Sequence, residues 1–173
     1  MKKLTNAELG RKSQEEFKNL KKLPIIIVLD NVRSAYNVGS VFRTADAFPI
    51  EAIFLCGITA CPPHKEILKT ALGATDTVEW SYYKSAIEAV QELRKRNYLV
   101  YSVEQTQSSC HLNNFFCDQK YALVFGHEVD GVHQEVINLC DGAIEIPQGG
   151  TKHSINIAVS TGVVLWELYK RTL

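Results

Sequence analysis

Two short glycine-rich turns lie in the C-terminal third of the chain, and their residue types suit the binding of a polar ligand. The first is Gly126-His-Glu-Val-Asp-Gly131 and the second is Gln148-Gly-Gly-Thr151. Glycine lets the backbone approach a ligand closely or take positive φ. Each turn follows an apolar run of strand length. Because open α/β sheets bind ligands beyond the carboxyl ends of their strands, both turns are predicted at such an edge.

The segment after the second turn predicts the start of a final helix. Ser154 suits the N-cap position, because its hydroxyl can accept a hydrogen bond from a free amide of the first helical turn. Asn156 adds a second short polar side chain just beyond it. A strand, a turn and a capped helix without any ligand explain this segment equally well, so other segments must decide.

A third set of polar residues lies closer to the N-terminus, in the segment 31–46. Its polar first half predicts a loop, and its second half predicts a helix from about Asn37. Val38 and Val41 lie on the apolar face of that helix, which leaves Arg43 on another side. An exposed arginine is most often only a solvated cation, so Arg43 by itself does not indicate a function.

Common nucleotide and metal motifs are absent from the sequence. It has no GxGxxG after the first strand and no GxxxxGK[ST], which disfavours Rossmann dehydrogenases and P-loop enzymes. The five cysteines form no CxxC pair. Cys110 and Cys117 near His111 could begin a metal site, but a fourth matched ligand is missing, so we predict no metal.

Apolar runs alternate with helical patterns along the chain. The run 24–30 is rich in β-branched residues and predicts a strand buried on both faces, as in a parallel sheet. The alternation predicts an α/β fold with a mostly parallel sheet flanked by helices. Further strands are predicted at 51–56, 77–80, 98–103, 121–125 and 143–146, helices at 64–72, 85–96, 133–139 and 155–171, and a loop at 105–119.

A basic arm is predicted at residues 1–22, ahead of a main domain at residues 23–173. The arm holds seven Lys and Arg against three Glu, although the whole chain holds 19 basic and 19 acidic residues. Thr5 and Glu8 have the spacing of a capping box, which predicts a helix from about residue 6 to residue 19. Such an arm suggests a polyanionic partner, and a solvated helix without a partner is the ordinary alternative.

The sequence carries no pattern of a signal peptide or a membrane span. No apolar run approaches the ~18 residues of a spanning helix, and no apolar segment follows the charged N-terminus. Scattered cysteines without a secretion signal favour reduced thiols. We therefore expect a cytoplasmic protein that does not enter a membrane.

Three segments in a fixed order resemble the motifs of a known family. Asn37-Val-Gly-Ser-Val-Phe-Arg-Thr-Ala resembles N-x-G-x-x-x-R-T-A, and the turn at 126–131 resembles G-x-E-x-x-G. Ile144-Glu-Ile-Pro147 followed by Ser154-Ile-Asn-Ile-Ala-Val159 is similar to I-P-x-x-G…S-L-N-V-x-V. Over about residues 24–170, the chain thus resembles the SpoU (TrmH-like) family of RNA 2′-O-ribose methyltransferases in the SPOUT superfamily.

The resemblance implies a fold and partners that periodicity does not reveal. The α/β domain of the family has a C-terminal deep trefoil knot, the SPOUT or alpha-beta knot, which forms a pocket for S-adenosylmethionine. The family works on RNA as homodimers. The implied catalytic residues are Arg43, Asn37, Glu128, Ser154 and Asn156. The implied cofactor-binding residues are Val103, Glu104, Phe125, Gly126, Ile146, Gln148, Gly150, Ser154 and Ile155.

The implied roles can be argued chemically. A guanidinium is a poor base because it stays protonated at ordinary pH, so Arg43 would bind the target phosphate or stabilise a developing alkoxide. The base role that is proposed for the family would require a strongly lowered pKa, and it stays an open alternative. Asn37 would orient Arg43 or brace the loop. Glu128 would hold the motif loops together, or approach Arg43 or the partner subunit. His127 stands where the family has Asn, so the hydrogen bonds of this turn are expected to differ.

The RNA substrate is predicted to be tRNA. Val103-Glu-Gln-Thr106 and Gln148 resemble the family's eukaryotic-type enzymes, which modify the D-loop guanosine of tRNA. An rRNA substrate is one alternative. A knotted RNA-binding or assembly factor without catalysis is another, and a methyltransferase for a small molecule or a protein is a third.

Overall fold

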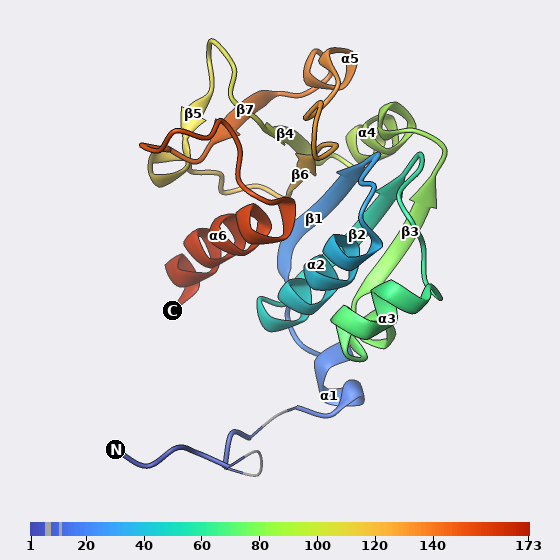
Figure 1. Cartoon of the computed structure of the whole chain (residues 1–173), viewed down its shortest axis with the longest axis vertical. Coiled ribbons are helices and arrows are strands. Elements are labelled where there is room, and N and C mark those ends of the chain that lie inside the picture. The colour runs from blue at the N-terminus through green and yellow to red at the C-terminus, as the bar shows by residue number, and fades with distance from the viewer. Residues whose placement is uncertain (6–7, 11) are drawn as a thin grey trace.

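Seven strands form one sheet at the centre of the computed structural model (Figure 1), which describes residues 1–5, 8–10 and 12–173. The strands are β1 (Leu23–Asp30), β2 (Ile50–Cys56), β3 (Glu79–Tyr83), β4 (Leu99–Val103), β5 (Cys110–His111), β6 (Tyr121–Phe125) and β7 (Gly142–Glu145). Their order is β3-β2-β1-β6-β4-β7-β5, and neighbouring strands pair in parallel. The carboxyl ends of all strands therefore meet at one edge.

The residues of β1 show why the sequence forms this sheet. Ile25, Ile27 and Leu29 pack into one core, whereas Ile26 and Val28 pack into a second core on the opposite face. None of the five is more than 2% exposed. A strand that is buried on both faces needs consecutive apolar residues, which is the pattern that predicted it.

Helices cover both faces of the sheet. They are α1 (Gln14–Lys18), α2 (Ala35–Ala47), α3 (Lys65–Ala71), α4 (Ala86–Lys95), α5 (Gln134–Ile137) and α6 (Ile157–Tyr169). Side chains of α2, α3 and α6 fill the first core, and those of α4 and α5 fill the second. Figure 1 shows these helices on the sheet. The predicted α/β class with a parallel sheet is confirmed. Among the described residues, no helix combines the length and the apolar character that a membrane crossing requires.

The N-terminal helix is shorter than the sequence predicted. It begins only after Ser13, which forms a capping box with Glu16. Gly10 has a φ of 57°, in the left-handed region, which is incompatible with a continuous helix. Residues 6, 7 and 11 of the predicted helix lie outside the described part of the chain. The prediction is therefore correct only for Gln14–Lys18.

The last helix also begins later than predicted. Asn156, and not Ser154, is the N-cap of α6, because its Oδ1 accepts hydrogen bonds from Ala158 N at 2.9 Å and Val159 N at 3.4 Å. Asparagine and serine cap helices about equally well, so residue type could not decide between them. Ser154 lies in the preceding loop and is exposed.

Two edge strands were predicted inaccurately. The third strand runs over 79–83 instead of 77–80, and the segment predicted as a loop contains the two-residue strand β5. Both strands lie at the ends of the sheet order, and β5 is exposed along its length. An edge strand buries few side chains, so its apolar pattern is weak.

Candidate functional site

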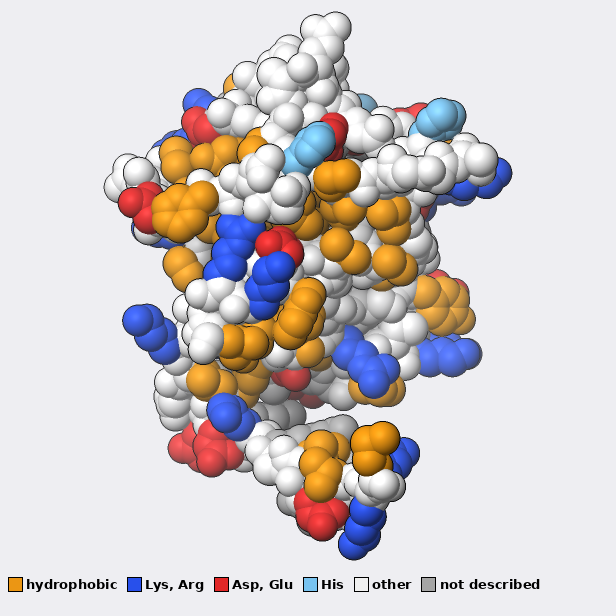
Figure 2. Space-filling model, turned by 90° about the vertical axis from the view of Figure 1, so that its left-hand side faces the viewer, with side chains coloured by type: hydrophobic (Ala, Val, Ile, Leu, Met, Phe, Trp, Pro, Cys, Tyr) orange, Lys and Arg blue, Asp and Glu red, His pale blue; other side chains and the backbone are white. Residues whose placement is uncertain are grey.

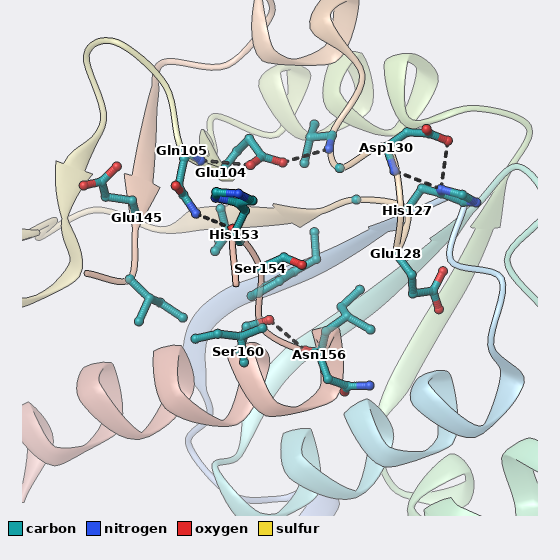
Figure 3. Close-up of a pocket in the computed structure, with 18 of the residues that line it drawn as sticks. Glu104, Gln105, His127, Glu128, Asp130, Glu145, His153, Ser154, Asn156 and Ser160 are labelled. Atoms are coloured by element: carbon teal, nitrogen blue, oxygen red, sulfur yellow. Dashed lines mark hydrogen bonds and ion pairs between the residues drawn. The ribbon is translucent and has the colours of Figure 1, made fainter. Parts of the chain in front are cut away.

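An open cleft of about 650 Å³ lies at the carboxyl ends of β4, β6 and β7 (Figure 3). Its walls come from Glu104 after β4, the turn 126–132 after β6, and the segment 146–156 after β7. The volume is within the usual range for small-molecule sites. Of the predicted cofactor residues, Gly150 is not among its lining residues in the described chain. Those that line it are Val103, Glu104, Phe125, Gly126, Ile146, Gln148, Ser154 and Ile155.

The carboxylate of Glu128 holds the loop that leads into α2. Its Oε2 accepts a hydrogen bond from Arg33 N at 2.9 Å, and its Oε1 accepts from Ser34 N and Asn37 Nδ2, both at 3.0 Å. Burial raises the pKa of Glu128, but these hydrogen bonds outweigh it, so the pKa is lowered from its ordinary value. Glu128 therefore keeps a negative charge beside the N-terminal end of α2, which favours anions.

A chain of hydrogen bonds joins the three motif segments. Asn37 donates to Glu128, and its Oδ1 accepts a hydrogen bond from Asn156 Nδ2 at 3.3 Å. Because Asn156 also caps α6, the N-termini of α2 and α6 are tied to the 126–131 turn. Asn37 and Glu128 thus connect the motif loops, while their role in function stays a prediction.

Arg43 lies apart from this network. It is exposed on the second half of α2 and does not line the cleft, as far as the chain is described. It lies six positions after Asn37, which corresponds to about 9 Å along a helix axis. Within one chain, the structure therefore does not bring Arg43 together with the other predicted catalytic residues.

The glycines of the two turns serve different purposes. A Cβ on Gly126 would overlap the backbone of Gly131, and Gly131 itself has a φ of 68°. The first turn therefore requires glycine at both ends. Neither Gly149 nor Gly150 has positive φ, and a Cβ on either would meet nothing within 4 Å. Positive φ is thus the wrong explanation for this pair, and close approach of a ligand stays a prediction.

His127 caps its own turn. Its Nδ1 lies 3.3 Å from Val129 N and 3.2 Å from Asp130 N, in position to accept from both, and 3.0 Å from Asp130 Oδ2. The backbones of His127 and Gly131 exchange hydrogen bonds of 3.0 and 2.9 Å. With Nδ1 unprotonated, the ring nitrogen accepts these hydrogen bonds as the oxygen of an asparagine could, whereas pairing with Asp130 Oδ2 requires a proton on Nδ1.

Two sets of contacts in the cleft were not predicted to be functional. Gln105 Nε2 donates to His153 O at 2.8 Å. Glu145 Oε2 accepts from Ser109 Oγ at 2.7 Å, and its Oε1 lies 2.9 Å from His111 Nε2. Gln105 belongs to the segment 103–106, which the sequence analysis had singled out for its resemblance to the eukaryotic-type enzymes of the family. Glu145 carries no such signal, because one acidic residue at the end of a strand is commonplace.

Comparison with known proteins supports one family assignment. The model of the SpoU rRNA Methylase family matches residues 24–166. The chain is 28% identical over 156 residues to the 23S rRNA (guanosine-2'-O-)-methyltransferase RlmB of Neisseria meningitidis serogroup B, covering 89% of this chain and 61% of that protein. The chain spans between 59% and 68% of the length of the curated relatives it matches.

Solved structures share the fold. The TrmH/SpoU tRNA modifying enzyme of A. aeolicus superposes with a TM-score of 0.81 at 22% identity, covering 91% of this chain and 81% of the other. An AdoMet-bound rRNA methyltransferase from Sinorhizobium meliloti gives 0.80 at 24% identity, covering 91% and 60%. The family model extends over most of the 173 residues, and hydrogen bonds join its three motif segments beside the cleft. The chain therefore belongs to the SpoU rRNA Methylase family.

Proposed function

We propose that this protein is an S-adenosylmethionine-dependent RNA methyltransferase that acts on a ribose 2′-hydroxyl. The observation that carries the proposal is the hydrogen-bond chain from Glu128 through Asn37 to Asn156. It joins one residue from each motif segment beside a cleft of suitable size. The bound AdoMet of the Sinorhizobium meliloti relative supports a cofactor of the same kind.

The cleft offers what an adenosine-bearing cofactor needs. Backbone groups of Phe125, Gly126, Ile146 and Gln148 would meet the base, and Ile155 would pack against it. When bound, the cofactor supplies an electrophilic methyl group on a sulfonium ion. The residues of this chain must then hold the ribose so that its 2′-oxygen approaches that methyl group in line with the breaking carbon–sulfur bond.

The proton of the 2′-hydroxyl must leave during the transfer. Arg43 is a poor base, and its exposed position outside the cleft supports a different role, in which the guanidinium binds a phosphate of the RNA bidentately. Ser154 and Asn156 would lie near the target phosphate, because the N-terminus of a helix attracts anions. Asn37 and Glu128 would hold the three motif segments in fixed positions relative to one another.

A homodimer is part of the proposal. Val159, Val163 and Trp166 form an apolar stripe on α6 at i, i+4 and i+7, and they are 55%, 40% and 50% exposed. Figure 2 shows hydrophobic side chains, interspersed with Lys and Arg, on the side of the molecule that carries α6. The opposite side of α6 is buried in the core, and a helix that is apolar all round is normally covered on all sides.

The stripe can be tested by the oligomeric state. Trp166→Glu should convert a dimer to a monomer in light scattering, because it places a charge in the proposed interface. Glu167→Gln is the control, because it changes a charge on the same helix outside the apolar stripe. Glu167 pairs with Lys170 of its own chain, so its loss should leave the dimer intact. A monomeric wild-type protein would contradict the proposal.

We also propose that residues 23–173 form the methyltransferase domain with a C-terminal trefoil knot, and that residues 1–22 form a basic extension that binds RNA. After β7 the chain returns towards α2, where Asn156 meets Asn37, which supports the knot. If the chain is knotted, pulling it by its two ends should tighten the knot. The unfolded chain should then be shorter than a fully extended chain with the same number of residues. Full extension would rule the knot out.

The five free cysteines suit a reducing cytoplasm.

For the RNA, we favour tRNA and keep rRNA as the alternative. The segment 103–106 and Gln148 support tRNA, as does the tRNA modifying enzyme of A. aeolicus, whereas the relative from Neisseria meningitidis acts on 23S rRNA. Transfer of labelled methyl groups to unmodified tRNA and to rRNA, followed by nucleoside mass spectrometry, distinguishes the two. Binding that weakens steeply with salt would show that phosphates are contacted.

The same assay tests catalysis. Arg43→Ala should reduce transfer at least 100-fold, since a transition-state or phosphate contact is lost. Arg96→Ala is the matched control, because Arg96 is exposed at the end of α4 on the other face of the sheet. Tight RNA binding without cofactor binding would favour a non-catalytic binding factor instead, and full activity of Arg43→Ala would contradict the assigned role.

A further inference from the structure

We propose that Glu104 and Gln105 form a clamp that holds both walls of the cleft in position, and that cofactor affinity depends on this clamp. The inference rests on the proposed function, since it assigns a role within the same cleft. The two residues directly follow β4, and each contacts a different wall (Figure 3). They act through the walls, so we regard them as positioning residues, and for Glu104 this role replaces the direct cofactor contact that the resemblance implied.

Glu104 holds the wall that follows β6. Its Oε2 accepts a hydrogen bond from Val132 N at 3.1 Å, and its Oε1 accepts from Gln105 N at 2.9 Å. The carboxylate lies so close to Gly131 that any side chain there would overlap it. Hydrogen bonds from backbone N–H groups to a carboxylate are stronger than those between neutral groups. Glu104 therefore fixes the end of the 126–131 turn.

Gln105 holds the wall that follows β7. Its Nε2 donates to His153 O at 2.8 Å. Within the described chain, this is the one hydrogen bond found for residues 147–155, which form no helix or strand. Residues 147–154 are all exposed. A single side chain thus fastens a loop that has little else to restrain it.

The clamp should affect the affinity of the enzyme for its cofactor more than the rate of methyl transfer. Gln148, Ser154 and Ile155, three predicted contacts of the cofactor, lie on this loop and line the cleft. A loop that is already held in its bound position loses less conformational entropy when the ligand binds. The clamp should therefore lower the Kd for S-adenosylmethionine, while the rate of methyl transfer from the saturated enzyme should depend on it little.

Gln105→Glu is an almost isosteric change that tests the contact between Gln105 and the loop 147–155. The carboxylate has no N–H to donate to His153 O, so we expect the Kd for S-adenosylmethionine to rise about 3- to 10-fold by calorimetry. We expect kcat at saturating cofactor to stay within twofold. Gln107→Glu is the matched control, since it adds the same charge at an exposed residue nearby. Its Kd should stay within twofold of the wild-type value.

Trypsin cleavage after Lys152 provides a readout that needs no cofactor. Lys152 lies on the fastened loop and is exposed. Releasing the loop should increase the cleavage rate about 3- to 10-fold in Gln105→Glu, and Gln107→Glu should be cut like the wild type. Cleavage after Lys120 serves as the internal reference. If the wild type binds no S-adenosylmethionine, the proposed function fails, whereas the cleavage rate still tests the clamp.

Glu104→Gln tests the contact between Glu104 and the wall that follows β6. An amide has one acceptor oxygen, so it cannot accept from both Val132 N and Gln105 N. We expect the Kd to rise about 10-fold, because a charge-assisted bond is lost. Unchanged cleavage after Lys152 in Gln105→Glu, or an unchanged Kd in both variants, would overturn the clamp. A loss of kcat at an unchanged Kd would overturn the positioning role.

Discussion

Replacing Glu128 by Gln should loosen the three motif segments while the side chain keeps nearly the same shape. The carboxylate accepts from Arg33 N, Ser34 N and Asn37 Nδ2. The amide of Gln has one acceptor oxygen, so at least one backbone N–H loses its partner and faces another N–H donor. Hydrogen bonds to a charged group contribute about 1.5–3 kcal/mol each. Because Glu128 is only half-buried, we expect the free energy of unfolding to fall by about 2 kcal/mol.

The effect should depend on pH in a defined direction. The pKa of Glu128 is lowered in the folded protein, so its carboxylate stabilises the fold fully above the pKa of the unfolded chain, about 4.3. The stabilisation is lost as the pH falls through the lower folded pKa. The wild type should therefore exceed the variant in stability at pH 7, and the difference should shrink below about pH 4.

Urea unfolding at pH 7 and at pH 3 measures both effects. Glu79→Gln is the control, since Glu79 is an exposed acid at the edge of the sheet and its loss should change stability by less than about 0.5 kcal/mol. Equal stability of wild type and Glu128→Gln at pH 7 would refute the bracing role. A difference of the same size at pH 3 would show that the charge is not its source.

Three further outcomes are expected. Gly39→Ala should lower the free energy of unfolding by about 2 kcal/mol, because its Cβ would overlap Ile67 O and push α2 away from α3; an unchanged thermal midpoint would show that the contact relaxes. Phe17→Ala should cost about 2–3 kcal/mol in urea unfolding, since the ring is only 7% exposed and anchors the basic arm, and an unaffected midpoint would mean that the arm is not docked. Burial raises the pKa of the Cys56 thiol far above its ordinary value, so alkylation at pH 8 should reach exposed Cys110 first and Cys56 last in timed mass spectrometry; early labelling of Cys56 would contradict its burial.

The elements that the sequence predicted well are those with strong local patterns. The central strand β1 is apolar at consecutive positions because both of its faces are buried, and that burial is visible in residue type alone. The edge strand β5 is exposed and has no such pattern. In the arm, the positive φ of Gly10 is incompatible with the predicted helix, and the capping box at Ser13 starts α1 only afterwards.

The sequence predicted a set of site residues, whose roles stay predictions, but it did not predict the geometry that joins them. Asn37 and Asn156 are 119 residues apart in the chain, and their hydrogen bond depends on how α2 and α6 pack. Ordered motifs could indicate that they act together, but the choice of Asn156 over Ser154 as the helix cap could not be read from residue type. The Gln105 contact with His153 O depends on the path of a loop without regular structure.

The order of the strands has a consequence for how the protein is made. β1 lies between β2 and β6, and its register pairs Ile25 with Tyr121. At about 5–20 residues per second, the ribosome needs roughly 5–20 s to add the residues that separate these partners. During that interval the most apolar strand of the sheet has one unpaired edge, which is a site for aggregation. The nascent chain should therefore depend on a chaperone until β6 emerges from the ribosome.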